Sequence, residues 1–276
     1  MTAAWNGRTE IVDLLVARGA TVDAVDEAET TALVHAAGKG HADTVALLLD
    51  RGATIEVAGE RGTTPLIVAA YWGHAEVVST LLARGAQVDR RDQDGSTALL
   101  AAAGAGRTAV VRALLAAGAD ANAANSEGGT PVILAAQNGD RDTVDTLLAH
   151  GAKVRAKAAD GATALLAAAA EGNTDVVRML VATGARVDET DSQGITPLMA
   201  AAANDEPESV EALLAAGANV EATNADGATA LDLARQEQND EVITLLERAM
   251  KKRGAARQAT TPRRADRGVR ERTRAE

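Results

Sequence analysis

The segment TPLIVAAYWGHAEVVSTLLARGA, from Thr64 to Ala86, is one copy of a pattern that recurs along most of the chain. A Thr-Pro-Leu-like start returns every 33 residues, at Thr31, Thr64, Thr97, Thr130, Thr163, Thr196 and Thr229. A Gly-Ala pair follows each of the first six threonines after 21 residues, at Gly52, Gly85, Gly118, Gly151, Gly184 and Gly217. An uninterrupted period of this length is typical of a solenoid of stacked units.

Each unit has the pattern of two short helices. The motif threonine can cap the first helix, and a proline follows it in three of the seven units, where a missing N–H is tolerated. A glycine such as Gly73 then breaks the pattern, and apolar residues such as Val77 and Leu81 follow at helical spacing. The Gly-Ala pair ends the second helix, and segments such as Asp92–Gly95 predict a tight hairpin tip before the next unit.

This turn-helix-helix unit, with T-P-L-x-x-A-A and a later L-L-x-x-G-A, resembles the ankyrin repeat family over roughly residues 1–250. The resemblance implies an all-α solenoid with short hairpin tips. The chain departs from the family's T-P-L-H form, because the His position is apolar in six units and Asp232 in the last. Packing between repeats is therefore expected to be mostly aliphatic there. His41 and His74 occupy a recurrent position of the family that has a structural hydrogen-bonding role.

The two ends of the repeat region differ from its middle. Residues 1–25 lack the Thr-Pro-Leu start, so we expect a truncated first repeat, followed by seven 33-residue units that complete a repeat domain over residues 1–250. The last unit replaces apolar residues with polar ones such as Asp232 and Arg235, as a C-terminal cap requires. The truncated start leaves open that the chain is the repeat portion of a larger protein.

Charge is distributed unevenly along the chain. Residues 251–276 contain ten Lys or Arg and three Asp or Glu, and no aromatic residue, which predicts a disordered, arginine-rich tail. Since the whole chain carries −11, the acidic body of residues 1–250 carries −18. The body therefore favours a protein partner with basic groups and disfavours nucleic acid, while the tail leaves electrostatic binding to nucleic acid or a membrane surface as an alternative.

Composition argues against an enzyme. Aromatic residues make up 1% of the chain, Cys and Phe are absent, and the four His lack ligand spacing, so we expect neither a catalytic centre nor a metal or cofactor. No apolar run is long enough to span a bilayer, and no secretory signal is visible. We expect a monomer that is cytoplasmic as given, with an exported form left open. The predominance of Arg over Lys, with abundant Ala, suggests a bacterial source.

The candidate binding residues follow from the aromatic side chains. In the ankyrin family the concave surface comprises the hairpin tips and the far end of each first helix, and all three aromatic residues fall at such positions. Tyr and Trp are common interface anchors, which predicts a protein-binding scaffold. The alternative is that Trp5 and Tyr71 pack on neighbouring repeats to fill space left by Gly38. The expected partner-binding residues are Trp5, Lys39, Glu60, Arg61, Thr63, Tyr71, Trp72, Asp94, Gln137 and Asn138.

Overall fold

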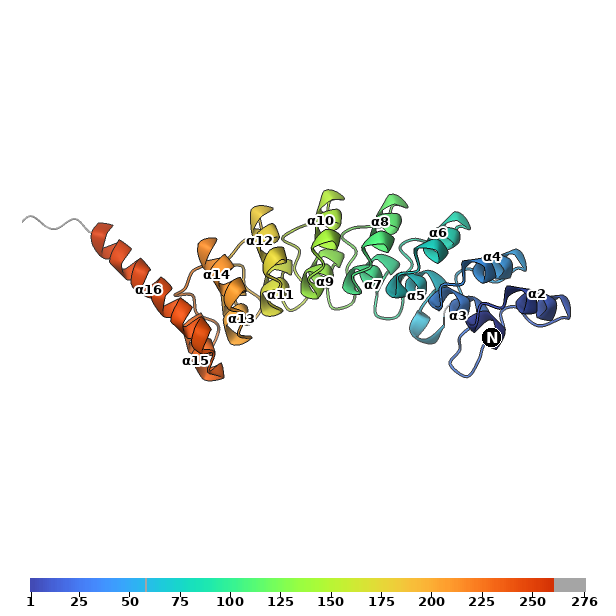
Figure 1. Ribbon diagram of the computed structural model, residues 1–276, viewed down its shortest axis with the longest axis horizontal. Helices are drawn as coiled ribbons and strands as arrows, with labels where there is room; N and C mark the ends of the chain where they lie inside the picture. The colour runs from blue at the N-terminus through green and yellow to red at the C-terminus, as the bar shows by residue number, and fades with distance from the viewer. Residues whose placement is uncertain (58, 261–276) are drawn as a thin grey trace, which may run out of the picture.

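A curved row of helix pairs makes up residues 1–57 and 59–260, the part of the chain that the computed structural model describes, apart from the side chains of Glu60 and residues 254–260 (Figure 1). The first helices of the pairs are α1 (Thr2–Trp5), α3 (Ala32–Gly38), α5 (Pro65–Trp72), α7 (Ala98–Gly104), α9 (Pro131–Asn138), α11 (Ala164–Ala170), α13 (Pro197–Ala203) and α15 (Ala230–Glu237). The second helices are α2 (Thr9–Ala17), α4 (Ala42–Asp50), α6 (Ala75–Ala83), α8 (Thr108–Ala116), α10 (Arg141–Ala149), α12 (Thr174–Ala182), α14 (Pro207–Ala215) and α16 (Asp240–Thr260). The all-α solenoid expected from the period is confirmed.

The motif threonines begin the first helices as predicted. The hydroxyl of Thr64 accepts a hydrogen bond from the N–H of Ile67 at 3.3 Å, and the equivalent bond forms in α3, α7, α11, α13 and α15. Proline occupies the first turn of α5, α9 and α13. Thr130, before α9, is the exception, because its buried hydroxyl has no hydrogen-bond partner.

Small side chains allow the first helices to pack closely on one another. Ala69 and Ala70 of α5 and Ala102 and Ala103 of α7 are fully buried, and the second helices add larger residues such as Leu81. The same arrangement repeats in each pair, so one apolar core runs the length of the stack. This packing excludes the three aromatic side chains, all of which are about half exposed.

The glycines between the two helices of a pair leave space for a polar side chain of the next repeat. Gly139 has a left-handed φ of 77°, and a side chain on it would clash with the side-chain amide of Asn173 in the next repeat. His41 and His74 occupy the same position as Asn173 and reach the main-chain oxygens of Trp5 at 2.9 Å and of Gly38 at 3.0 Å. Their predicted structural role is confirmed.

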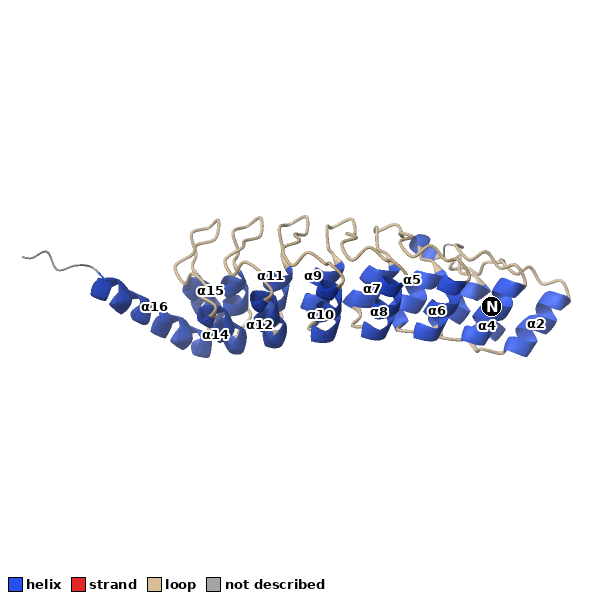
Figure 2. Ribbon diagram, turned by 90° about the horizontal axis from the view of Figure 1, so that it is seen from above, coloured by secondary structure: helices blue, strands red, loops and turns tan. Residues whose placement is uncertain are grey.

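The hairpin tips form a continuous edge along the stack (Figure 2). Within one tip, the carboxylate of Asp92 accepts hydrogen bonds from the N–H groups of Asp94 and Ser96. Five main-chain bonds of 2.7–3.0 Å then join successive tips, beginning with the N–H of Gln93 and the C=O of Arg61 and repeating to Ala225. The tips are thus positioned by backbone contacts as well as by the helices below them.

The ends of the stack differ in what they expose. At the N-terminal end, Ile11, Leu14 and Leu15 of α2 are each about half exposed, because no preceding repeat covers them. At the other end α16 continues to Thr260, so the expected disorder from residue 251 is wrong for residues 251–260. The Arg253 guanidinium donates to the side-chain oxygen of Asn219 at 2.7 Å, which ties this extension to the preceding repeat. The disordered tail predicted for residues 261–276 lies outside the described residues.

Candidate protein-binding surface

The first helices and the tips line the inner side of the arc, and the second helices lie on the outer side (Figures 1 and 2). This arrangement places the carboxyl ends of α1, α3, α5 and α9 on the inner surface, where most of the candidate binding residues were predicted. The concave surface therefore combines side chains from helices of consecutive repeats.

Tyr71 and Trp72 form an exposed aromatic pair at the end of α5. The left-handed Gly73 ends the helix directly after them. Their rings meet edge to face with centroids 5.2 Å apart, and 51% of Tyr71 and 55% of Trp72 stay exposed. Gly38 leaves room on the preceding helix for Val68 and for the edge of Trp72. The aromatic pair is thus held in place by its neighbours without being buried.

An apolar cavity of about 450 Å³ opens beside this aromatic pair. Tyr71, Trp72 and the predicted Thr63 contribute to its wall, and the remaining lining comes from α5, α7, α9 and the adjacent tip. Its apolar lining residues are Ile67, Val68, Leu100, Ala101 and Leu134. A cavity with aromatic and branched walls can accept an apolar side chain of a partner.

Trp5 belongs to a second cluster, two repeats away from Tyr71 and Trp72. Its ring meets that of His35 edge to face at 5.3 Å, and the ammonium of Lys39 lies 4.0 Å from the Trp5 ring centroid. A cation over an indole face is attracted by its π electrons. Trp5 therefore packs partly on the next repeat, as the alternative interpretation expected, while 46% of the residue remains exposed.

His35 is held in this cluster by Asp26 in the tip before it. The two side chains are 2.6 Å apart, and this hydrogen bond from His35, together with those from the main chain of Thr30 and Ala28, lowers the pKa of Asp26. Neither His35 nor Asp26 was among the predicted partner-binding residues. His35 occupies the position that is Val68 and Leu134 in later repeats, so a polar residue in an otherwise apolar concave column was the signal available.

The predicted tip residues Arg61 and Asp94 lie on neighbouring tips and contact each other. One guanidinium nitrogen of Arg61 lies 2.7 and 2.8 Å from the two carboxylate oxygens of Asp94. The pair is more than half exposed, so it contributes at most about 1 kcal/mol to stability. The charges of these two residues are thus compensated within the chain. The side chain of Glu60 lies outside the described part of the structure.

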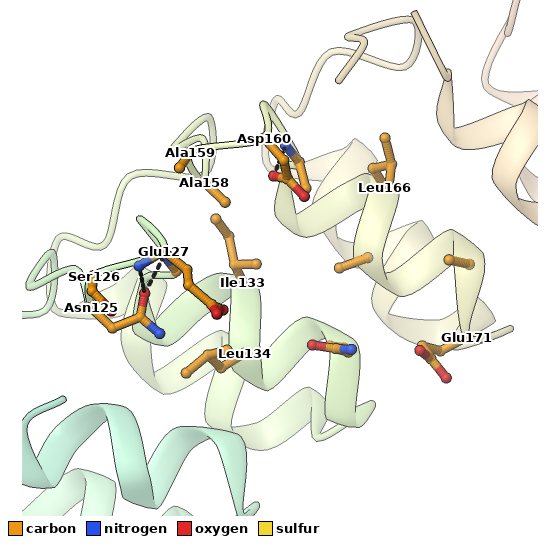
Figure 3. Close-up of a pocket in the computed structure, with 15 residues that line it drawn as sticks. Asn125, Ser126, Glu127, Ile133, Leu134, Ala158, Ala159, Asp160, Leu166 and Glu171 are labelled. Atoms are coloured by element: carbon orange, nitrogen blue, oxygen red, sulfur yellow. Dashed lines mark hydrogen bonds between the residues drawn. The ribbon is translucent and has the colours of Figure 1, made fainter. Parts of the chain in front are cut away.

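A second cavity, of about 640 Å³, lies between α9 and α11 (Figure 3). Gln137 lines it as part of the predicted surface, whereas Asn138 is exposed and packs against Gly106 of the preceding repeat. The predicted partner-binding residues did not include the rest of the lining, which comprises Ile133, Leu134 and Leu166 and the acidic residues Glu127, Asp160 and Glu171. The repeat period gave a signal for it, since Leu134 and Val68 occupy equivalent positions.

Within residues 1–57 and 59–260, no three or more His, Asp or Glu side chains come together as a possible metal site. No described helix is both long and apolar enough to cross a membrane. The features of the inner surface are therefore aromatic and aliphatic side chains, cavities and exposed charges, which are suited to recognition of another chain.

Comparison with known proteins places the chain in the ankyrin repeat family, as the sequence resemblance implied. The family model for ankyrin repeats in three copies matches residues 1–92, 84–158 and 165–254, so the chain belongs to this family. Among solved structures, the human ASB11 ankyrin repeat domain is similar, with 29% sequence identity and a TM-score of 0.72. The alignment covers 79% of this chain and 98% of that domain. The search of curated proteins gave no match.

Proposed function

We propose that this protein is a non-enzymatic interaction scaffold that binds a partner protein on its concave surface. The observation that carries the proposal is the half-exposed pair of Tyr71 and Trp72 beside an apolar cavity. Large aromatic side chains at the edge of a cavity are common anchors of binding energy, because a partner can remove most of their surface from water. Membership of a family of interaction modules supports the same function.

The negative charge of the repeat region favours a partner with basic groups. The body of the chain carries a net charge of −18, so a partner with basic groups associates faster and its binding weakens as salt rises. Trp5 and Lys39 extend the surface toward the N-terminal end, and Thr63, Gln137 and Asn138 supply polar contacts around it. The concave surface supports protein binding better than residues 251–276 support nucleic-acid binding, because that basic segment has no aromatic residue to stack on bases.

The test compares two double variants of the full chain in affinity capture from source-cell lysate, quantified by mass spectrometry. The first, Tyr71→Ala/Trp72→Ala, removes the aromatic pair; the second, Leu14→Ala/Leu15→Ala, removes two equally exposed apolar side chains on α2, away from the concave surface. Circular dichroism first establishes that both variants fold. We expect the first variant to lose a partner that the second retains. Identical captures by the first variant and the native chain would refute the assignment of the anchor.

A further inference from the structure

The second cavity combines an apolar floor with an acidic rim. Ile133, Leu134 and Leu166 supply aliphatic surface, while Glu127 and Asp160 come from successive tips and Glu171 from the carboxyl end of α11. Figure 3 shows these carboxylates around the apolar side chains, on different sides of the cavity. All three acidic residues are exposed. The volume of about 640 Å³ is ample for one long side chain together with part of its backbone.

The three carboxylates have no cationic partner in the described part of the chain. Among the described residues, no Lys, Arg or His lies within ion-pair distance of Glu127, Asp160 or Glu171. Other tip carboxylates are paired, for example Asp94 with Arg61. A cavity with an apolar floor and an unpaired acidic rim matches a Lys or Arg side chain, whose methylene stem packs on apolar surface while its charge reaches the rim.

The two cavities are neighbours on the concave surface, because Leu134 lines both of them. The first lies between α5 and α7 and the second between α9 and α11, so their centres are two repeats apart. With neighbouring helices about 8–10 Å apart, this separation is roughly 16–20 Å. An extended chain advances about 3.3 Å per residue, so about five or six residues connect the two cavities. An extended segment therefore reaches from one cavity to the other with fewer residues than a helical segment would need.

We infer that the concave groove binds an extended segment of a partner protein that places an apolar side chain beside Tyr71 and Trp72 and, about five or six residues away, a Lys or Arg between Glu127, Asp160 and Glu171. This inference rests on the proposed function and adds the chemistry and spacing of the ligand. The first cavity supplies apolar contact area, and the second selects the cation and fixes the register of the segment.

The experiment selects binders from a phage-displayed library of random 12-residue peptides with the purified full chain. Enriched peptides are synthesised, and their dissociation constants are measured by fluorescence anisotropy at low and high salt. The acidic-rim variant is Glu127→Gln/Asp160→Asn/Glu171→Gln, in which the new Asn keeps the oxygen that accepts from the N–H of Ala162. The charge-matched control, on exposed positions of the outer helices, is Asp145→Asn/Glu211→Gln/Glu241→Gln.

We expect enriched peptides to share an apolar residue and a Lys or Arg at the stated spacing. The acidic-rim variant should raise the dissociation constant at least tenfold and reduce its salt dependence, while the control changes it less than twofold. Equal weakening by both variants would show a long-range charge effect and overturn the second cavity as the cation site, as would selected peptides without a cation.

Failure of the inference is separable from failure of the proposed function. Peptides that need Tyr71 and Trp72 but no cation overturn the inference and leave the proposed function intact. Peptides that bind the Tyr71→Ala/Trp72→Ala variant as tightly as the native chain overturn the anchor itself. If no peptide is enriched over selection on uncoated support, both the groove inference and a peptide-binding concave surface are refuted.

Discussion

Glu206 occupies a position where most other repeats place a hydrogen-bond donor, such as His74 or Asn173; Asp140 is the other exception, and its carboxylate accepts hydrogen bonds from Thr108 and Thr143. The side-chain amides of Asn173 and Asn239, in the equivalent positions, each donate to two main-chain oxygens at the end of the preceding first helix, over 2.8–3.2 Å. An ionised carboxylate cannot donate. The Glu206 carboxylate instead lies over Gly172, at the carboxyl end of α11, where the helix dipole is negative.

We predict that Glu206→Asn stabilises the fold. The backbone at Glu206, with φ −108° and ψ 73°, is close to that at Asn173, with φ −75° and ψ 64°, so the amide can reach the same oxygens. Because Asn204 already donates to the oxygen of Ala170, we count one new bond. That bond contributes about 0.5–1.5 kcal/mol, and loss of the charge at the helix end about 0.3–1 kcal/mol. The free energy of unfolding should rise by about 1–2 kcal/mol at pH 7, or roughly 2–8 °C in Tm.

The pH dependence of this gain has a definite sign. Burial, followed by the charges of Glu208, Asp205 and Glu171, raises the pKa of Glu206 above its usual 4.5. The folded chain therefore binds this proton more tightly than the unfolded chain, so the native protein loses stability as pH rises from the unfolded pKa through the raised one. Glu206→Asn has no such group, and its advantage over the native chain should be larger at pH 7 than at pH 4.

Urea unfolding followed by far-UV circular dichroism at both pH values measures this difference. The reverse change, Asn173→Glu, is the matched control, since it removes both hydrogen bonds and places a carboxylate at the end of α9; it should lower the free energy of unfolding by about 1–3 kcal/mol. Equal midpoints for Glu206→Asn and the native chain at pH 7, with parallel pH dependence, would refute the reasoning.

Three further predictions test the helix caps, the backbone conformation and the end of the stack. Thr97→Val should lower the free energy of unfolding by about 1 kcal/mol through loss of a helix cap, whereas Thr130→Val should be neutral or stabilising because the Thr130 hydroxyl is buried without a partner; urea unfolding that ranks them the other way would contradict this. Asp205→Gly should raise the thermal midpoint, by about 0.5–1 kcal/mol of stability, since Asp205 has a left-handed φ of 58°; an unchanged midpoint would show no strain there. Hydrogen exchange should show weaker protection for residues 1–30 than for the central repeats, and uniform protection would count against fraying from the exposed face of α2.

The parts of the fold that depend on local sequence were predictable. The 33-residue period fixed the helix pairs, the threonine caps and the glycines, because each of these features is set by a few neighbouring residues. The same period placed Tyr71, Trp72 and Gln137 on the inner surface, and the structure keeps them there.

What the sequence could not provide depends on contacts between residues far apart in the chain. The extension of α16 is tied down by Arg253 and Asn219, which are 34 residues apart. The missing cap hydrogen bond of Thr130 is visible only in the structure, because Thr130 occupies the same motif position as the threonines that do cap their helices. The acidic rim likewise arises from two tips and a helix end, and no single stretch of sequence contains it.

The backbone bonds that join successive tips have a consequence for how this surface can change. Because main-chain N–H and C=O groups make these bonds, the edge does not depend on which exposed side chains the tips carry, such as Ser126 or Ala159. Exposed tip side chains that make no hydrogen bond within the tip can therefore be exchanged one at a time while their supporting frame, which includes Asp92, is retained. The same stack could be redirected to a different ligand by substitutions at these tip positions and at Tyr71 and Trp72.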